Sequence, residues 1–223
     1  VMEDFPNNYD LGEEVKKEIA KDWQAYTKVL IVAGQANYST SLSRILNTTS
    51  TQLTIPIIGE ITSNLHAVEG RIGHADAFLG AANNEITAGL KPDLLITFEK
   101  SILSKHLKKF LRKHKPAAHW HIQPAGNVAD VFQSITRVIR AQPESVFSFV
   151  NSLPSKSDFE KQKQINFKQL WNAEEGKVIR ATQDFFPHQP FGEFELVNEV
   201  IKNLPEHANL HLASSMSVRY ANF

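Results

Sequence analysis

Short apolar runs alternate with longer amphipathic stretches along most of this chain. An apolar run of roughly four to eight residues is typical of a strand buried on both faces, and apolar residues three and four apart indicate a helix. The first pattern predicts strands at residues 29–33, 55–61, 93–98 and 117–122. The second predicts helices at residues 11–26, 41–46, 75–82 and 102–111, while residues 131–139 carry both signals.

Strands that alternate with helices at these spacings are the pattern of βαβ units, whose strands run parallel. Right-handed crossovers between such strands place helices on both faces of the sheet. The predicted fold is therefore α/β: a doubly wound, Rossmann-like parallel sheet with helices on both faces.

The chain becomes polar and charged after Pro154. Beyond that point the pattern predicts helices at 164–173 and 194–204, a loop with two prolines at 185–190, a strand at 210–213 and a loop at 214–219. We expect one domain at 1–154, a linker with a helix at 155–190, and the truncated start of a second domain at 191–223. The chain begins with Val1 and stops soon after the last predicted strand, so we expect both ends to be cut from a longer protein.

Composition narrows the class of protein. The sequence has 24 Lys+Arg against 24 Asp+Glu, so charge gives no reason to expect a nucleic-acid partner. A basic cluster at residues 105–115 has the spacing of a solvated helix face. The chain has no cysteine, which suits the cytoplasm, and no apolar run reaches the roughly 20 residues of a membrane span.

The glycine-rich loop of a dinucleotide-binding sheet is missing. Gly34, after the first predicted strand, is followed by Gln35, Ala36 and Asn37, with no second glycine where the fingerprint needs one. The Walker pattern is missing too. A Rossmann-like topology without its phosphate loop favours a structural domain over a nucleotide-binding one.

Histidines offer weaker signals. His119 and His121 lie two apart on a predicted strand, so they point the same way and could hold a metal with a nearby carboxylate; packing in the sheet is the favoured interpretation. His66 and His74 lie in a loop rich in Gly and Asn, where ligand binding is possible in an α/β sheet but a solvated connection is the favoured interpretation. Glu60, Glu85 and Glu99 end or flank predicted strands, without an evident second carboxylate for any of them.

Four stretches, in their order along the chain, resemble one enzyme family. They are Pro56–Leu65, Phe98–Lys105, Phe191–Phe194 with the helix that follows, and Ser214–Tyr220. The last, Ser-Ser-Met-Ser-Val-Arg-Tyr, is similar to the Asn-Ser-Met-x-Val-Arg motif of the 2-succinyl-5-enolpyruvyl-6-hydroxy-3-cyclohexene-1-carboxylate synthases, the MenD family. Ser214 stands where that motif has Asn, and Ser217 stands where Pro is common.

The resemblance implies a carboligase of menaquinone biosynthesis. Enzymes of this family use thiamine diphosphate and Mg²⁺ to decarboxylate 2-oxoglutarate and then add the remaining four-carbon unit to isochorismate. Both substrates carry carboxylates, and a guanidinium binds a carboxylate through two parallel hydrogen bonds. The matched motifs imply that Arg219 and Ser215 bind the oxoglutarate carboxylate and that Lys105 meets isochorismate.

The resemblance also shows what this chain lacks. The Gly-Asp-Gly motif that holds Mg²⁺ and the diphosphate in thiamine enzymes does not occur in the sequence, and neither does the segment with the activating glutamate. We therefore expect no catalytic residue, no bound cofactor, no metal and no activity in this chain alone, and a homo-oligomer, dimer or tetramer, for the whole enzyme. Two alternatives stay open: the middle domain of an acetolactate-synthase-like enzyme, which can bind FAD, and a free-standing α/β binding module.

Overall fold

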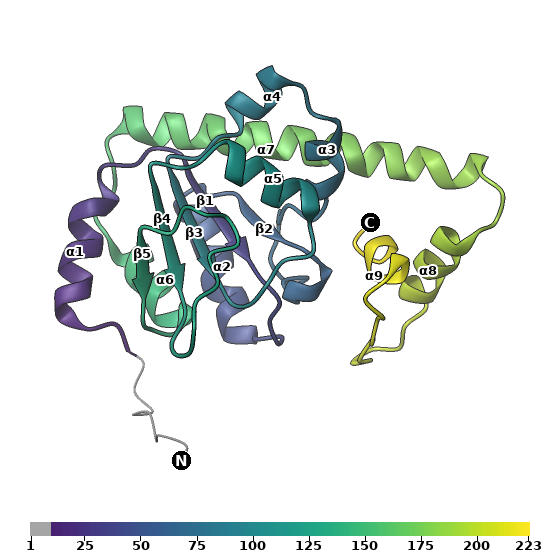
Figure 1. Cartoon of the computed structure of the whole chain (residues 1–223), viewed down its shortest axis with the longest axis horizontal. Helices are drawn as coiled ribbons and strands as arrows, with labels where there is room; N and C mark the ends of the chain where they lie inside the picture. Colours follow the sequence, from purple (N-terminus) through teal and green to yellow (C-terminus); the bar gives the residue numbers. More distant parts are fainter. Residues whose placement is uncertain (1–9) are drawn as a thin grey trace, which may run out of the picture.

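A computed structural model describes residues 10–223, and its centre is a five-stranded sheet in the order β2-β1-β3-β4-β5 (Figure 1). Each neighbouring pair of strands is parallel, which confirms the predicted fold class. The strands are β1 (Val29–Ala33), β2 (Ile57–Gly59), β3 (Leu94–Phe98), β4 (Ala118–Ile122) and β5 (Arg137–Ile139). The second strand is shorter than predicted, and the fifth arises from the segment whose signals were mixed.

Helices cover both faces of this sheet. Those before residue 154 are α1 (Glu13–Trp23), α2 (Thr40–Gln52), α3 (Ala75–Ala81), α4 (Asn84–Gly89), α5 (Lys105–Lys113) and α6 (Pro143–Ser152). Those after it are α7 (Asp158–Phe185), α8 (Glu193–Lys202) and α9 (Met216–Tyr220), with single 3-10 turns at Ile61–Ser63 and Phe186–His188. Helices α1, α2 and α6 share one apolar cluster with the sheet, and α3, α5 and α7 share the other.

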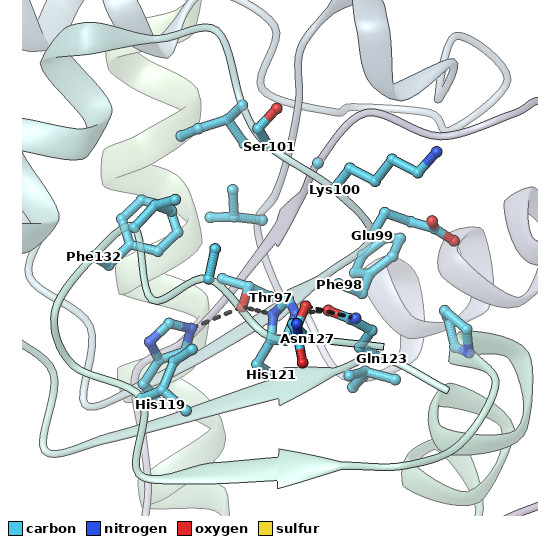
Figure 2. Close-up of a pocket in the computed structure, with 18 of the residues that line it drawn as sticks. Thr97, Phe98, Glu99, Lys100, Ser101, His119, His121, Gln123, Asn127 and Phe132 are labelled. Atoms are coloured by element: carbon cyan, nitrogen blue, oxygen red, sulfur yellow. Dashed lines mark hydrogen bonds between the residues drawn. The ribbon is translucent and has the colours of Figure 1, made fainter. Parts of the chain in front are cut away.

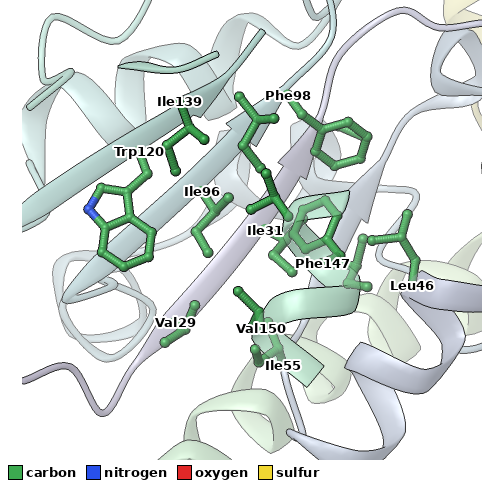
Figure 3. Close-up of a cluster of buried hydrophobic side chains, with 14 of the residues drawn as sticks. Val29, Ile31, Leu46, Ile55, Ile96, Phe98, Trp120, Ile139, Phe147 and Val150 are labelled. Atoms are coloured by element: carbon green, nitrogen blue, oxygen red, sulfur yellow. The ribbon is translucent and has the colours of Figure 1, made fainter. Parts of the chain in front are cut away.

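The two clusters follow from the period of two along each strand. In β1, the side chains of Val29, Ile31 and Ala33 enter one cluster, and those of Leu30 and Val32 enter the other. Figure 3 shows the first cluster, in which side chains of β1, β3 and β4 meet helices α2 and α6. A strand that is apolar on both faces is therefore buried on both, as its sequence predicts.

The amide of Gln164 in α7 completes the end of β1. Its Oε1 accepts a hydrogen bond from Val29 N at 2.7 Å, and its Nε2 donates to Val29 O at 3.2 Å and to Thr54 O at 3.3 Å. Because β2 begins opposite Ile31, it leaves Val29 without a strand partner on that side. The glutamine amide offers a donor and an acceptor together, as a neighbouring strand would.

Two predictions for the second part of the chain need correction. Residues 210–213 form no strand in the described chain. Residues 216–219, expected as part of a loop, belong to the helix α9. A strand needs neighbours for its backbone groups, and residues 209–211 are exposed instead of lying against the sheet. The helix predicted at 164–173 is also longer, at 28 residues, and Gln164, Phe167, Trp171 and Glu175 on it are buried. The domain boundary near 154 stays a prediction.

Replacing Gln164 should reveal how much the fold depends on this amide. Gln164→Ala leaves Val29 N–H and C=O buried without a partner, at a cost of about 2–4 kcal/mol in the free energy of unfolding. Urea unfolding followed by circular dichroism measures the change. The matched control is Gln169→Ala on the exposed side of the same helix, which should shift the free energy by less than about 0.5 kcal/mol. Equal effects of the two variants would show that Gln164 contributes only to the helix.

Candidate functional site

The crevice in which a Rossmann-like sheet binds dinucleotides is closed in this protein. It would lie where strand order reverses, between the loops after β1 and β3. Those loops bond directly to each other: Gln35 N donates to Ser101 O at 2.9 Å, and Lys100 N donates to Gln35 O at 3.3 Å. A Cβ on Gly34 would lie 1.9 Å from Lys100 O, so only glycine permits this approach.

This pairing does not fit a bound dinucleotide. A pyrophosphate needs main-chain N–H groups that point at it from the loop and from the start of the helix. Here the N–H groups of Gln35 and Lys100 bond to the opposite loop, and the hydroxyl of Ser39 accepts from Leu42 N at the start of α2. The main-chain amides of Gln35 and Lys100 are therefore not free to bind a pyrophosphate.

A cavity of about 390 Å³ lies at the carboxyl ends of β1, β3 and β4 and reaches the two joined loops at Gly34 and Lys100 (Figure 2). Thr97 on β3 pairs in register with His121 on β4, and Leu95 pairs with His119. The alternation of the strands therefore points Thr97 and both histidines to the same face. Phe132, the loop that begins at Gln123 and the segment 99–102 after β3 also line the cavity.

A directional chain of hydrogen bonds runs through these side chains. Gln123 Nε2 donates to Ala125 O at 2.6 Å and to Asn127 O at 3.1 Å, which fixes its Oε1 toward His121 Nε2 at 3.1 Å. His121 Nε2 therefore carries the proton, and its Nδ1 accepts from the Thr97 hydroxyl at 2.8 Å.

The same logic fixes the other histidine. The hydroxyl of Thr97 has given its proton to His121, so it accepts from His119 Nε2 at 2.8 Å. His119 Nδ1 then accepts from the Ser134 hydroxyl at 3.0 Å. Both rings are neutral, and burial agrees with this: it lowers the pKa of His119 to about 4 and the pKa of His121 below its usual range. The packing interpretation of these histidines is the one that the structure supports.

A second cavity, of about 200 Å³, lies where the last described residues meet the five-stranded sheet with its covering helices, which we call the sheet domain. It is lined by Glu60 at the end of β2, by Asp76 on α3 and by Ser104 before α5. From the other side, Arg219 and Tyr220 on α9 line it. It thus brings together residues that are far apart in the sequence.

Two carboxylates bind the start of α5 within this cavity. Glu60, which is 4% exposed, accepts from Leu103 N at 2.5 Å and from Ser104 N at 2.7 Å. Asp76 accepts from the Ser104 hydroxyl at 2.5 Å and from His106 N at 2.8 Å. Negative charge at a helix N-terminus is stabilising, so this pair fixes the position of the helix that begins at Lys105.

The two carboxyl groups differ in their pKa. Burial raises the pKa of Glu60 above its ordinary value, although the main-chain amides of Leu103 and Ser104 oppose the shift. Burial acts the same way on Asp76, but the Ser104 hydroxyl, the His106 amide and the charge of Arg219 hold its pKa below the ordinary value. The sequence indicated no second carboxylate near Glu60. In the structure Asp76 is the second carboxylate at the start of α5, and no pattern in the sequence linked the two residues.

His74 joins the same region to α7. Its Nδ1 lies 2.7 Å from Glu175 Oε1, and its Nε2 lies 3.0 Å from Phe223 O. Both partners are acceptors, so both ring nitrogens carry protons and the ring is positively charged. Burial opposes this charge, but Glu175 raises the pKa of His74. His74 is therefore a half-buried ion-pair residue rather than part of a solvated loop. His66 instead stacks on Tyr38 with ring centroids 4.8 Å apart.

The three residues expected to bind substrate are placed differently from one another. Arg219 lines the second cavity from α9 and is exposed. Lys105 is exposed at the first position of α5, directly after Ser104, which lines the same cavity. Ser215 is exposed at the N-cap of α9, outside the residues that line the cavity. Arg219 is on a helix and not, as predicted, on a loop after a strand.

The α/β fold and this sequence define a class of protein. Residues 8–212 match the family model described as the middle domain of thiamine pyrophosphate, and the chain belongs to that family. The match ends before Ser215 and Arg219, so their proposed role rests on the motif resemblance, and Arg219 in addition lines the second cavity.

The particular relatives are 2-succinyl-5-enolpyruvyl-6-hydroxy-3-cyclohexene-1-carboxylate synthases, as the motif resemblance predicts. The synthase of Cytophaga hutchinsonii is 36% identical over 215 residues, which are 96% of this chain and 36% of the relative. The synthases of Flavobacterium johnsoniae and Bacteroides thetaiotaomicron are 30% and 33% identical over 93% and 88% of this chain. The chain thus spans about a third of the length of the curated relatives it matches.

The described residues lack two kinds of feature, a metal-binding cluster and a membrane-spanning helix. Within residues 10–223, His, Cys, Asp and Glu side chains form no group of three that could hold a metal ion. None of the helices in this part of the chain has the length and apolar character that crossing a bilayer requires.

The neutral histidine chain predicts how stability depends on pH. In the unfolded chain each histidine takes up a proton near pH 6.5, but the buried His119 resists this until about pH 4. The contribution to stability is thus complete above pH 6.5 and declines as the pH falls toward 4, by up to about 1.4 kcal/mol per pH unit for His119. Urea unfolding at several pH values measures this slope.

The matched variants are His119→Gln and His207→Gln. Glutamine at 119 does not titrate, so the acid slope should become shallower. His207 is exposed, so its replacement should leave the slope unchanged. The same slope in wild type and His119→Gln would show that folding does not lower the pKa of His119.

Proposed function

We propose that this chain is the middle part of a carboligase that decarboxylates 2-oxoglutarate and adds the four-carbon unit to isochorismate. The observation that supports this most is the second cavity, where Arg219 of the matched motif lies opposite Ser104 and the start of α5. The names of the relatives give the product, and the motif resemblance gives the substrates.

One guanidinium in the cavity, that of Arg219, suits the binding of a carboxylate. Glu60 and Asp76 already bind the main-chain amides at the start of α5, so those amides are not available to a substrate. Recognition of an anion then depends on side-chain cations, and Arg219 is the guanidinium among the described residues that line the cavity. Its five donors allow a fork to one carboxylate while its charge also faces Asp76.

In this proposal Lys105 meets the second substrate. It directly follows Ser104, and the bonds of Ser104 to Asp76 and Leu107 N fix the backbone from which its side chain projects. An exposed ammonium on a fixed backbone can reach a carboxylate that enters from solvent. For Ser215, the N-cap residue of α9, the motif resemblance alone supports a hydroxyl bond to the substrate.

The described residues do not fit thiamine diphosphate with its metal ion. They hold no cluster of three metal-ligating side chains, and the sequence has no Gly-Asp-Gly motif. We therefore assign to this chain the recognition of carboxylates and assign the cofactor chemistry to other parts of a protein of the relatives' length. The FAD-binding alternative is disfavoured by the closed crevice, and the free-standing module by the high share of this chain that the synthases match.

Assembly and location are also part of the proposal. Large apolar side chains are exposed at the end of α7 and around α8: Phe185, Phe191, Leu196 and Val200. An exposed apolar patch of this kind is typical of a surface that packs against other parts of an assembly. We propose a homo-oligomer, dimer or tetramer, in the cytoplasm, which suits a chain without cysteine.

The kinetic test of the proposal is Arg219→Ala in the synthase that contains this chain. The distal carboxylate of 2-oxoglutarate does not change during decarboxylation. Loss of its contact with Arg219 should therefore mainly weaken the binding of 2-oxoglutarate. We expect KM for 2-oxoglutarate to rise about ten- to a hundredfold, with a smaller loss of kcat because the substrate is held less firmly. Steady-state kinetics with each substrate varied in turn measures both.

Isochorismate provides the control for this variant, since its KM should move less. Arg219→Lys should recover little, because one ammonium cannot replace the planar fork. Unchanged oxoglutarate kinetics in Arg219→Ala would remove Arg219 from the substrate site.

A second experiment tests the assignment of the cofactor to other parts of the protein. Calorimetric titration of this 223-residue chain with thiamine diphosphate and Mg²⁺ should give no binding heat above dilution. Stoichiometric binding would mean that this chain itself holds a cofactor site, which contradicts the assignment of the cofactor to other parts of the protein.

A further inference from the structure

The side chain of Asn222 joins α9 to the sheet domain through two hydrogen bonds. Its Oδ1 accepts from Ile61 N at 2.7 Å, and its Nδ2 donates to Gly73 O at 2.9 Å. Ile61 and Gly73 belong to the segment between β2 and α3. One partner needs an acceptor and the other a donor, which a side-chain amide supplies and a carboxylate does not.

Helix α9 depends on such contacts for its position. It has five residues, and a helix of this length is not stable in isolation. Val218 and Ala221 are buried, and Tyr220 stacks on Phe194 with ring centroids 5.1 Å apart. These apolar contacts hold the helix but fix its direction only loosely, whereas the bonds of Asn222 are directional. Asn222 follows Arg219 within one helical turn, so it also fixes the backbone of Arg219.

The anchor continues from Asn222 into α7. Gly73, which accepts from Asn222, gives its own N–H to Glu175 Oε1 at 2.9 Å. His74 N donates to Glu175 Oε2 at 3.0 Å, and the His74 ring bridges Glu175 and Phe223 O. Glu175 is 7% exposed, so its charge is satisfied by these donors rather than by water. The network connects the core of the sheet domain to the residue proposed to bind substrate.

We propose that Asn222 is a positioning residue for Arg219, which fastens α9 to the segment 61–73 and so sets the guanidinium opposite Ser104 at the start of α5. The inference rests on the proposed role of Arg219 in binding the substrate carboxylate. In this proposal the segment 61–73 determines the affinity for 2-oxoglutarate by holding α9 in place.

The first test measures α9 itself and does not depend on any substrate. Hydrogen–deuterium exchange of the 223-residue chain, followed by mass spectrometry, reports the protection of residues 216–221. Asn222→Ala should increase exchange there about tenfold or more and leave β1 and β3 unchanged. Asn209→Ala, an exposed asparagine in the same part of the chain, is the matched control and should leave exchange unchanged. Unchanged exchange of 216–221 in Asn222→Ala overturns the inference.

The second test is a double-mutant cycle in the synthase that contains this chain. Asn222→Ala should raise KM for 2-oxoglutarate about three- to tenfold, with little change in KM for isochorismate and in melting temperature. In an Arg219→Ala background the same change should have almost no further effect, because Asn222 acts through Arg219. If the fold-change in KM of the double variant equals the product of the two single fold-changes, Asn222 acts independently of Arg219 and the inference is overturned.

The two tests separate this inference from the proposed function. If Arg219→Ala leaves oxoglutarate kinetics unchanged, the proposed function fails and the kinetic part of the inference fails with it. The exchange experiment still decides whether Asn222 holds α9. Conversely, a large effect of Arg219→Ala with unchanged exchange and kinetics in Asn222→Ala upholds the function and overturns the inference.

Discussion

The amide of Gln164 bonds to both main-chain groups of Val29, and the position of α7 depends on this contact. The short β2 leaves that position of β1 open, and a side chain from a distant helix fills it. Three turns further along the same helix lies Glu175, whose carboxylate accepts from Gly73 N and His74 N. The bond of Gln164 to the open end of β1 fixes α7, and α7 in turn places Glu175 against Gly73 and His74.

The need of main-chain groups for hydrogen-bond partners also explains the arrangement of the second cavity. The first N–H groups of a helix have no partner within it, and Glu60 and Asp76 supply partners for α5. Asn222 supplies partners for two main-chain groups that lie between β2 and α3. Buried polar groups left unpaired cost free energy, so each of these contacts holds two elements in one relative position. The geometry around Arg219 is therefore a consequence of how the backbone is satisfied, and not of apolar packing alone.

Sequence reasoning recovered the elements whose signals are local. The apolar run 29–33 is β1 at the predicted residues, because a strand buried on both faces needs no information from elsewhere. The strand expected at 210–213 is absent because a strand requires partners that a local pattern cannot guarantee. The cavity residues were harder still: Glu60 was noticed without its neighbour Asp76, and Asn222 carried no signal. Hydrogen bonds between residues this far apart in the chain leave no periodicity to detect.

The histidines show how far the environment, rather than the residue type, decides chemistry. His119 lies between the hydroxyls of Ser134 and Thr97, which can each adapt as donor or acceptor, so a neutral ring satisfies every bond. His74 lies between a carboxylate and a carbonyl, which can only accept, so its ring must carry both protons. Acidification therefore opposes the first arrangement, and alkaline pH opposes the second. The first holds two strands together and the second holds the C-terminal segment, so the sheet and the contact that places Arg219 respond to pH in opposite directions.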